Sequence, residues 1–384
     1  MPRLLVLTQA LQHKYEIRIG RGLLAASGAV VRRAVAPKAQ RAVLISNSRV
    51  FAYYGPSVMN SLEGSGFEVW PWLIGDGERH KSLRTVEKTV RFLSERKLER
   101  SDCVVALGGG IVGDVAGFSA ATFMRGLRLI QIPTTLVAQI DSSVGGKTGV
   151  NLPTGKNLVG AFHQPSAVII DIETLSTLPQ RELVGGWCEG VKQGAVASRK
   201  LFDQTVDFLG AQSAGGALIT ARLEALIGAH CAFKASIVAG DEREAINRND
   251  DRSRRVLNFG HTVAHALETI TRYRRFRHGE AVGYGILVAA ELSKHLGLLP
   301  RSELELIRKA VALCGPLPPA NDLDLRVIAD AIGRDKKTVG GHLQWVMLEG
   351  IGHPRIQDGK AISASLLRQS LKKVLGTTRG RGIL

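Results

Sequence analysis

CVVALGGGIVGD, residues 103–114, is the stretch that decides the fold class. Its first five residues are apolar and predict a buried strand. Glycines at 108, 110 and 113 then follow the spacing G-x-G-x-x-G before a helical pattern. Such glycines allow a tight turn and let backbone N–H groups approach a pyrophosphate at the start of a helix. The acidic residue expected about 20 residues further on is missing, so a nucleotide loop and a structural glycine turn both stay open.

Further short apolar runs predict strands over residues 42–46, 67–73, 128–132 and 167–171, with glycine- and proline-rich loops between 108 and 165. After residue 171 a 3.6-residue periodicity predicts helices over 181–197, 216–239, 261–270, 280–296 and 303–313, and one strand over 344–348. We therefore predict an α/β N-terminal nucleotide-binding domain, residues 1–172, and a mainly α-helical C-terminal metal- and substrate-binding domain, residues 173–384. The active site is expected in the cleft between them.

The composition is that of a soluble cytoplasmic protein. Hydrophobic residues make up 45% of the chain and charged residues 22%, which is ordinary for a globular fold. No apolar run reaches the roughly 18 residues that a membrane span needs, and no signal-peptide cleavage site follows the start. The four cysteines lack C-x-x-C spacing, which indicates reduced thiols.

The formal charge of +17 attracts anions. The basic residues fall in short runs, such as 272–277 and 379–381, and aromatic residues are only 5% of the chain. Few stacking platforms and no recognised module argue against a nucleic-acid partner. We expect a small anionic substrate, with a polyanion as the alternative.

DSSVGGKT, residues 141–148, resembles a phosphate-binding P-loop but has Asp141 where that motif needs glycine. It presents Lys147 after a glycine pair, and Gly155 precedes a second lysine, Lys156. Two lysines on flexible loops suit an anionic group, although exposed loop lysines are the open alternative.

Two histidines four residues apart, His261 and His265, share a helix face. Thr262 excludes the metalloprotease motif H-E-x-x-H. His278 begins the next helical segment, and Glu189 with Lys192 forms a costly charged pair in an apolar helix unless each has a partner. One glutamate and two histidines can bind a catalytic zinc ion, but the spacing also fits histidines with structural roles.

Taken together, GGGIVGDVAGF, DSSVGGKTGVN, GKNLVGAFHQP and NFGHTVAHALE, in this order, resemble the 3-dehydroquinate synthase family. The resemblance extends from residues 15–17 to 335–337. It implies that the chain converts 3-deoxy-D-arabino-heptulosonate 7-phosphate to 3-dehydroquinate and phosphate, a step of the shikimate pathway. NAD and Zn²⁺ or Co²⁺ are the cofactors that it implies.

The resemblance also implies the site residues. The implied metal ligands are Glu189, His261 and His278. The implied NAD contacts are Asp76, Gly77, Glu78, Arg79, His80, Lys81, Gly110, Ile111, Val112, Gly113, Asp114, Thr134, Thr135, Lys147, Lys156, Thr174, Leu175, Ser176 and Thr177. The implied substrate-binding and catalytic residues are Asp141, Lys147, Asn157, Lys192, Lys234, Arg254, Asn258, His265 and one of Lys336 and Lys337. Arg125 is expected to reach the substrate phosphate from the neighbouring subunit, which implies a homodimer.

Three departures from the family pattern stand out. About six extra residues, 247–252, precede Arg254 and put the choice between Arg254 and Arg255 in question. Gln193 replaces a tyrosine and Gly190 a larger aliphatic residue, and we interpret both as packing variation. The basic C-terminal tail has no counterpart in the family pattern.

Three other functions compete with this one. A metal-dependent polyol dehydrogenase of similar fold would lack the two loop lysines and Arg125. A sibling sugar-phosphate cyclase would change the positions of Lys234, Asn258 and His265. A non-catalytic basic binding protein would not need Glu189, His261 and His278 together.

Overall fold

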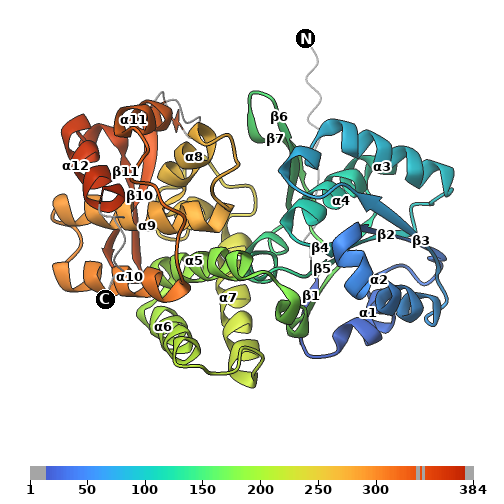
Figure 1. Ribbon diagram of the computed structural model, residues 1–384. Coiled ribbons are helices and arrows are strands. Elements are labelled where there is room, and N and C mark those ends of the chain that lie inside the picture. Colours follow the sequence, from blue (N-terminus) through green and yellow to red (C-terminus); the bar gives the residue numbers. More distant parts are fainter. Residues whose placement is uncertain (1–13, 334–337, 340–341, 377–384) are drawn as a thin grey trace, which may run out of the picture.

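The structure, a computed structural model, describes residues 14–333, 338, 339 and 342–376. A six-stranded parallel sheet forms its N-terminal half, in the order β1-β8-β5-β4-β2-β3 (Figure 1). Its strands are β1 (Glu16–Gly20), β2 (Arg41–Asn47), β3 (Glu68–Ile74), β4 (Cys103–Gly108), β5 (Arg128–Pro133) and β8 (Ala167–Asp171). The five predicted strands are confirmed. The edge strand β1 was not predicted, because it is short and alternates apolar with charged residues.

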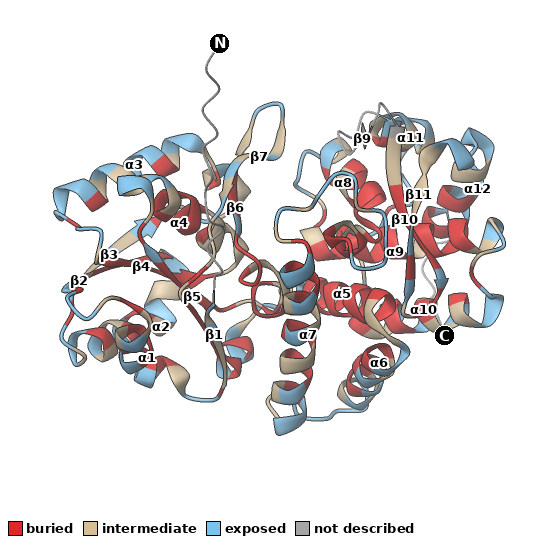
Figure 2. Ribbon diagram, turned by 180° about the vertical axis from the view of Figure 1, so that it is seen from behind, coloured by how far each residue is buried: buried red, intermediate tan, exposed pale blue. Residues whose placement is uncertain are grey.

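Helices cover both faces of this sheet. Leu44 of β2 packs in a core with α1 (Ser27–Ala34) and α2 (Ser48–Glu63), and its neighbour Ile45 packs in a second core with α3 (Leu83–Glu95) and α4 (Gly110–Thr122). Successive residues of a strand point to opposite faces of the sheet. Because helices cover both faces, the strand residues that point to either face are apolar. Figure 2 shows this burial along the central strands.

Between residues 108 and 165 the structure contains the predicted helix α4 and strand β5. Where only glycine- and proline-rich loops were expected, it also contains an antiparallel hairpin of β6 (Lys147–Leu152) and β7 (Gly155–Phe162). Gly149 pairs with Gly160 across this hairpin, and a Cβ atom on Gly160 would lie 2.1 Å from the Thr148 carbonyl oxygen. These glycines therefore permit a close approach of two strands.

The C-terminal half is mainly helical, as predicted (Figure 1). Its helices are α5 (Gln180–Ala197), α6 (Arg199–Ser213), α7 (Ala221–Gly240), α8 (His261–Ile270), α9 (His278–His295), α10 (Arg301–Cys314), α11 (Leu325–Gly333) and α12 (Ala364–Leu375). An antiparallel sheet contains β9 (Thr338–Val339), β10 (His342–Gly350) and β11 (His353–Asp358). The sequence did not predict the helices α6, α11 and α12 or the strands β9 and β11.

One core joins the two halves. Leu136 and Ile140, which follow β5, pack in the same cluster as Trp187 of α5 and Ile227 of α7. The division at residues 172 and 173 stays a prediction. Among the described residues, α7 is the one helix whose length and composition would suit a membrane span. Its buried residues Leu223, Leu226, Ile227 and Cys231 lie in this shared core.

Candidate active site

The residues predicted to bind NAD gather at one edge of the parallel sheet. Their loops follow the carboxyl ends of four strands: residues 76–81 follow β3, 110–114 follow β4, 134 and 135 follow β5, and 174–177 follow β8. Parallel strands end at the same edge, where α/β folds bind their ligands. The first turn of α4 adds unpaired N–H groups, which suit a pyrophosphate.

The hairpin β6–β7 is tied to this edge by polar contacts. Lys81 Nζ lies 2.5 Å from Asp114 Oδ2 and 2.5 Å from Asn157 Oδ1. Glu78, in η2 (Glu78–His80), accepts a hydrogen bond of 2.8 Å from Asn151 Nδ2 and lies 3.5 Å from Lys156 Nζ. Residues Glu78 and Lys81 thus contact the lysine-bearing hairpin directly, and Asp114 of the glycine loop is joined to it through Lys81.

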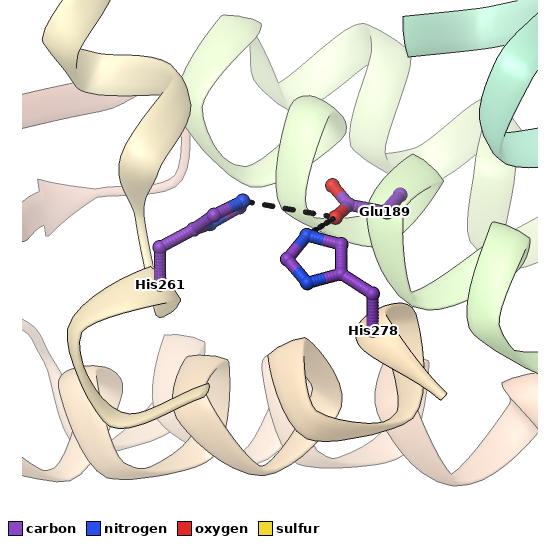
Figure 3. Close-up of side chains that lie close together, drawn as sticks. All are labelled: Glu189, His261 and His278. Carbon is purple, nitrogen blue, oxygen red and sulfur yellow. Dashed lines mark ion pairs between the residues drawn. The ribbon is translucent and has the colours of Figure 1, made fainter. Parts of the chain in front are cut away.

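Glu189, His261 and His278 lie together, with one ligand atom of each within 4.8 Å of the others. They come from α5, from the first residue of α8 and from the first residue of α9. Nε2 of His261 lies 3.8 Å from Glu189 Oε1, and Nε2 of His278 lies 3.4 Å from it (Figure 3). A carboxylate and two imidazoles that converge in this way form an acceptable zinc set with open positions.

The Glu189 carboxylate is the strongest sign that these residues fit a cation. It is fully buried, and neither oxygen has a hydrogen-bond partner among the described residues. Lys192 Nζ lies 2.6 Å from Oε2, so one cation already faces it. Burial favours a neutral carboxyl, but Lys192 and His278 hold the pKa of Glu189 below its usual value.

His278 is held from its other side by Glu268, a buried carboxylate of α8, 3.3 Å from Nδ1. Burial alone would lower the pKa of His278, but Glu268 and Glu189 raise it to about 10. Metal ligation requires the neutral imidazole, so a bound cation would displace this proton.

Asp141 and Lys234 form a second charged pair, with Oδ1 and Nζ 2.5 Å apart. Asp141 lies on a π-helical turn, η4 (Ala138–Ser142), a feature common at functional sites. Burial would raise the pKa of Asp141, but Lys234 and Lys192 hold it below its usual range. Burial lowers the pKa of Lys234, although Asp141 opposes that shift. Three predicted residues therefore share one charge cluster.

Gln193 has a more specific role than the packing variation that the sequence suggested. It is fully buried, and its Nε2 donates a hydrogen bond of 3.0 Å to the Ile140 carbonyl. Its Oε1 lies 3.1 Å from Nδ1 of the buried His230. Gln193 thus holds the turn that carries Asp141. At Gly190, by contrast, an added Cβ atom would meet Trp187 and His230 at ordinary van der Waals distances, which agrees with packing variation.

A cavity of about 320 Å³ is lined in part by Glu244, Arg255, Asn258 and Trp345, and Asn258 is the one predicted site residue among the described residues of its lining. Lys147 pairs with Glu244, and Asn258 Nδ2 lies 3.3 Å from Glu244 Oε1. Arg254 is buried and donates to the carbonyls of Glu242 and Gly145, whereas Arg255 lines the cavity. The choice of Arg254 for the substrate stays a prediction.

The other predicted residues differ in where they lie. The His265 ring centroid is 5.7 Å from that of His261 and 6.2 Å from that of His278, so it borders the ligand set. Arg125 is exposed in η3 (Phe123–Arg125), before the amino end of β5 and away from its own glycine loop. Lys336 and Lys337 lie outside the described residues.

Sequence reasoning missed Glu244 and Glu268. Glu268 lies three residues after His265 and seven after His261, so the helical spacing could have placed it on the same face. Glu244 lies before the extra residues, and only the fold brings it to Lys147.

Comparisons with known proteins agree with this geometry. The sequence matches the family models "3-dehydroquinate synthase N-terminal" over residues 72–185 and "3-dehydroquinate synthase C-terminal" over residues 186–338. A 3-dehydroquinate synthase from Symbiobacterium thermophilum is 42% identical over 338 residues, which cover 88% of this chain and 91% of that protein.

Solved structures share the fold. 2-epi-5-epi-valiolone synthase from Streptomyces hygroscopicus, with NAD⁺ and Zn²⁺ bound, has a TM-score of 0.83 at 23% identity, covering 96% of this chain and 99% of that one. 2-deoxy-scyllo-inosose synthase with carbaglucose-6-phosphate, NAD⁺ and Co²⁺ has a TM-score of 0.77 at 25% identity, covering 94% and 96%. The residues that the two family models match include the cofactor loops at the sheet edge and the cluster of Glu189, His261 and His278. The chain therefore belongs to the 3-dehydroquinate synthase family.

Proposed function

We propose that this chain converts 3-deoxy-D-arabino-heptulosonate 7-phosphate to 3-dehydroquinate and phosphate, with NAD and one divalent metal, Zn²⁺ or Co²⁺, as cofactors. One observation carries the proposal. The predicted metal ligands Glu189, His261 and His278 lie beside two buried lysines, Lys192 and Lys234. In the same chain, the glycine loop and the lysine-bearing hairpin lie at one edge of the parallel sheet. Relatives that cover most of this chain are named for that reaction.

The two cofactors supply what side chains cannot: when bound, NAD offers a reversible hydride acceptor and the metal polarises the ring oxygens. The chain provides the rest. Glu189, His261 and His278 hold the metal, and the residues at the sheet edge hold NAD. His265 lies close enough to the ligand set to move a proton at a substrate hydroxyl.

Cationic side chains orient the substrate. Lys192 and Lys234 bring positive charge to a buried site, which suits a flexible substrate that carries both carboxylate and phosphate. Their negative partners Glu189 and Asp141 offset the positive charges in this buried site. With NAD bound, C5 would give up its hydride to that cofactor, and the resulting carbonyl would acidify C6. The C6 proton would leave with the departing phosphate, and the hydride would then return to C5. Ring opening and intramolecular aldol closure would complete the product.

We further propose a cytoplasmic homodimer in which Arg125 binds the substrate phosphate of the partner subunit. Its support is geometric. Arg125 is exposed and has a backbone φ of +67°, next to Met124 at +49°, in a turn at the amino edge of the sheet. Such strained backbone often marks a functional contact. The cofactor loops lie at the opposite edge, so this arginine faces away from its own site.

The test of the reaction is phosphate release from the seven-carbon substrate with zinc and substoichiometric NAD. The proposal expects one phosphate per substrate and no accumulating absorbance of NADH, because hydride leaves and returns within one turnover. In a parallel reaction with excess NAD, NADH that builds up in proportion to the substrate consumed would instead identify a polyol dehydrogenase. Turnover of glucose 6-phosphate or sedoheptulose 7-phosphate alone would identify a sibling cyclase.

A further inference from the structure

Glu268 is a buried carboxylate without a role in the ligand set, and its two oxygens face two different halves of the molecule. Oε2 lies 3.3 Å from Nδ1 of His278, and Oε1 accepts a hydrogen bond of 3.0 Å from Lys156 Nζ. Only 2% of the side chain is exposed. A carboxylate in such a position must be matched by both partners, because an unpaired buried charge is costly.

The contact with His278 selects which ring nitrogen faces the other ligands. Nδ1 of His278 is directed to Glu268, and Nε2 is directed to Glu189. His261 repeats this arrangement with a different partner. Its Nδ1 lies 3.3 Å from the Phe259 carbonyl oxygen, and its Nε2 faces Glu189. Both histidines therefore present Nε2: the Glu268 carboxylate contacts Nδ1 of His278, and a backbone carbonyl contacts Nδ1 of His261.

The contact with Lys156 links Glu268 to the cofactor half, that is, the N-terminal half that carries the predicted NAD-binding residues. Lys156 belongs to β7, and its Nζ also lies 3.5 Å from Glu78 Oε1 in η2. Glu78 in turn accepts a hydrogen bond from Asn151 of β6. An unbroken series of charged contacts thus runs from the hairpin and η2 through Glu268 to His278.

We propose that Glu268 is a positioning residue for His278, and that Lys156 holds Glu268 so that metal affinity depends on the hairpin of the cofactor half. This inference rests on the proposed metal site. A carboxylate that accepts the second N–H of a ligating imidazole fixes its orientation and increases its basicity. Lys156 restricts where that carboxylate can lie.

Zinc affinity, measured by competition with a chromophoric chelator in the absence of NAD and substrate, tests the first part. Glu268→Gln should weaken zinc binding by about 10–100-fold, the usual effect of losing such a partner. The Co²⁺ absorption spectrum of the same variant should shift, because His278 is no longer held. Glu63→Gln, which removes an exposed carboxylate from α2, is the matched control and should keep the parental affinity.

A second variant keeps the test decisive if Glu268→Gln does not fold. Glu268→Asp retains the charge beside Lys156 but withdraws the carboxylate from His278 by one methylene, so it should also weaken zinc binding. Circular dichroism of the metal-free proteins reports whether each variant is folded. Parental zinc affinity in either folded variant overturns the positioning role.

A double-mutant cycle tests the part played by Lys156. Lys156→Met should weaken zinc binding at least about threefold in the parental chain, because Glu268 loses its restraint, and should have almost no further effect in the Glu268→Gln chain. Equal losses in both backgrounds would show that Lys156 acts by another route. These measurements use zinc alone, so a failure of the proposed reaction shows separately, as absent phosphate release.

Discussion

Lys192 Nζ lies 2.6 Å from Glu189 Oε2, one turn along α5, and at most 1% of either side chain is exposed. A lysine therefore compensates the charge of the carboxylate that is proposed to bind the metal. Burial would lower the pKa of Lys192, but Glu189 and Asp141 raise it above its usual value, so the ammonium stays charged. The site is thus partly neutralised before any cation binds.

This pairing predicts a stability effect that depends on metal. In the metal-free protein, Lys192→Met should lower the free energy of unfolding by about 3–5 kcal/mol, because it leaves a buried carboxylate without its partner. Zinc should restore much of the loss, since it supplies positive charge at the same group. Calorimetry with zinc and with a chelator measures both quantities.

The matched control is Lys200→Met, which removes an exposed lysine from α6. It should behave as the parent in both conditions. If Lys192→Met gains no more stability from zinc than this control does, Glu189 is not a ligand.

His278→Ala should abolish stoichiometric zinc binding, because two of the three ligands cannot complete the set. The fold should persist, since His278 is only the first residue of α9. Metal analysis after dialysis gives the stoichiometry, with His353→Ala in the exposed part of β11 as the control. One zinc per chain in His278→Ala would contradict the ligand set.

The sheet could be predicted because strands buried on both faces read as apolar runs, as Val104 and Val105 of β4 show. The hairpin β6–β7 could not, because its glycines signal a loop. Glycine is needed at these positions because Gly149 and Gly160 lie in close contact, and that contact exists only after the two strands pair. Strand β1 pairs with β8, about 150 residues away, and the sequence of β1 itself does not indicate that partner.

The metal cluster illustrates the same limit. The pair His261 and His265 is visible as a helical spacing, but Glu189 and His278 come from other helices. The residue types allowed a zinc site there, and the family resemblance was needed to select Glu189, His261 and His278 as its ligands. Gln193 was interpreted as packing because its partners, Ile140 and His230, lie on separate elements. Contacts between distant segments are set by the assembled core and have no periodicity in the sequence.

A pH dependence follows from His230, which is fully buried between Thr205 and Gln193. Burial lowers its pKa from 6.5 to about 4. Below about pH 6.5 the unfolded chain takes up this proton while the folded chain does not, until about pH 4. The free energy of unfolding should therefore fall as the pH drops through this window, by at most roughly 3 kcal/mol from this group.

Denaturant titrations of the parent and of His230→Asn at about pH 7 and about pH 5 measure that contribution. The variant should lose less stability between the two pH values than the parent does. His353→Asn is the control and should lose as much as the parent. An equal loss in all three proteins would exclude His230 as the source.

The composite site predicts complementation between two inactive variants. Arg125→Ala should lack the phosphate contact and His261→Ala the metal, so each homodimer is inactive. In a hybrid dimer, one site combines the intact His261 of the first chain with the intact Arg125 of the second. A symmetric dimer with random exchange should therefore recover about a quarter of the parental activity.

The control for this recovery is a mixture of His261→Ala with His278→Ala. Both changes fall in the same ligand set, so every site in their hybrid lacks one ligand and no activity should return. Subunit exchange is followed in both mixtures with differently tagged chains, which separates absent exchange from absent complementation. If exchange is complete and the Arg125→Ala mixture stays as inactive as the control, each site is built from a single chain. The exposure of Arg125 and its left-handed backbone would then need another explanation.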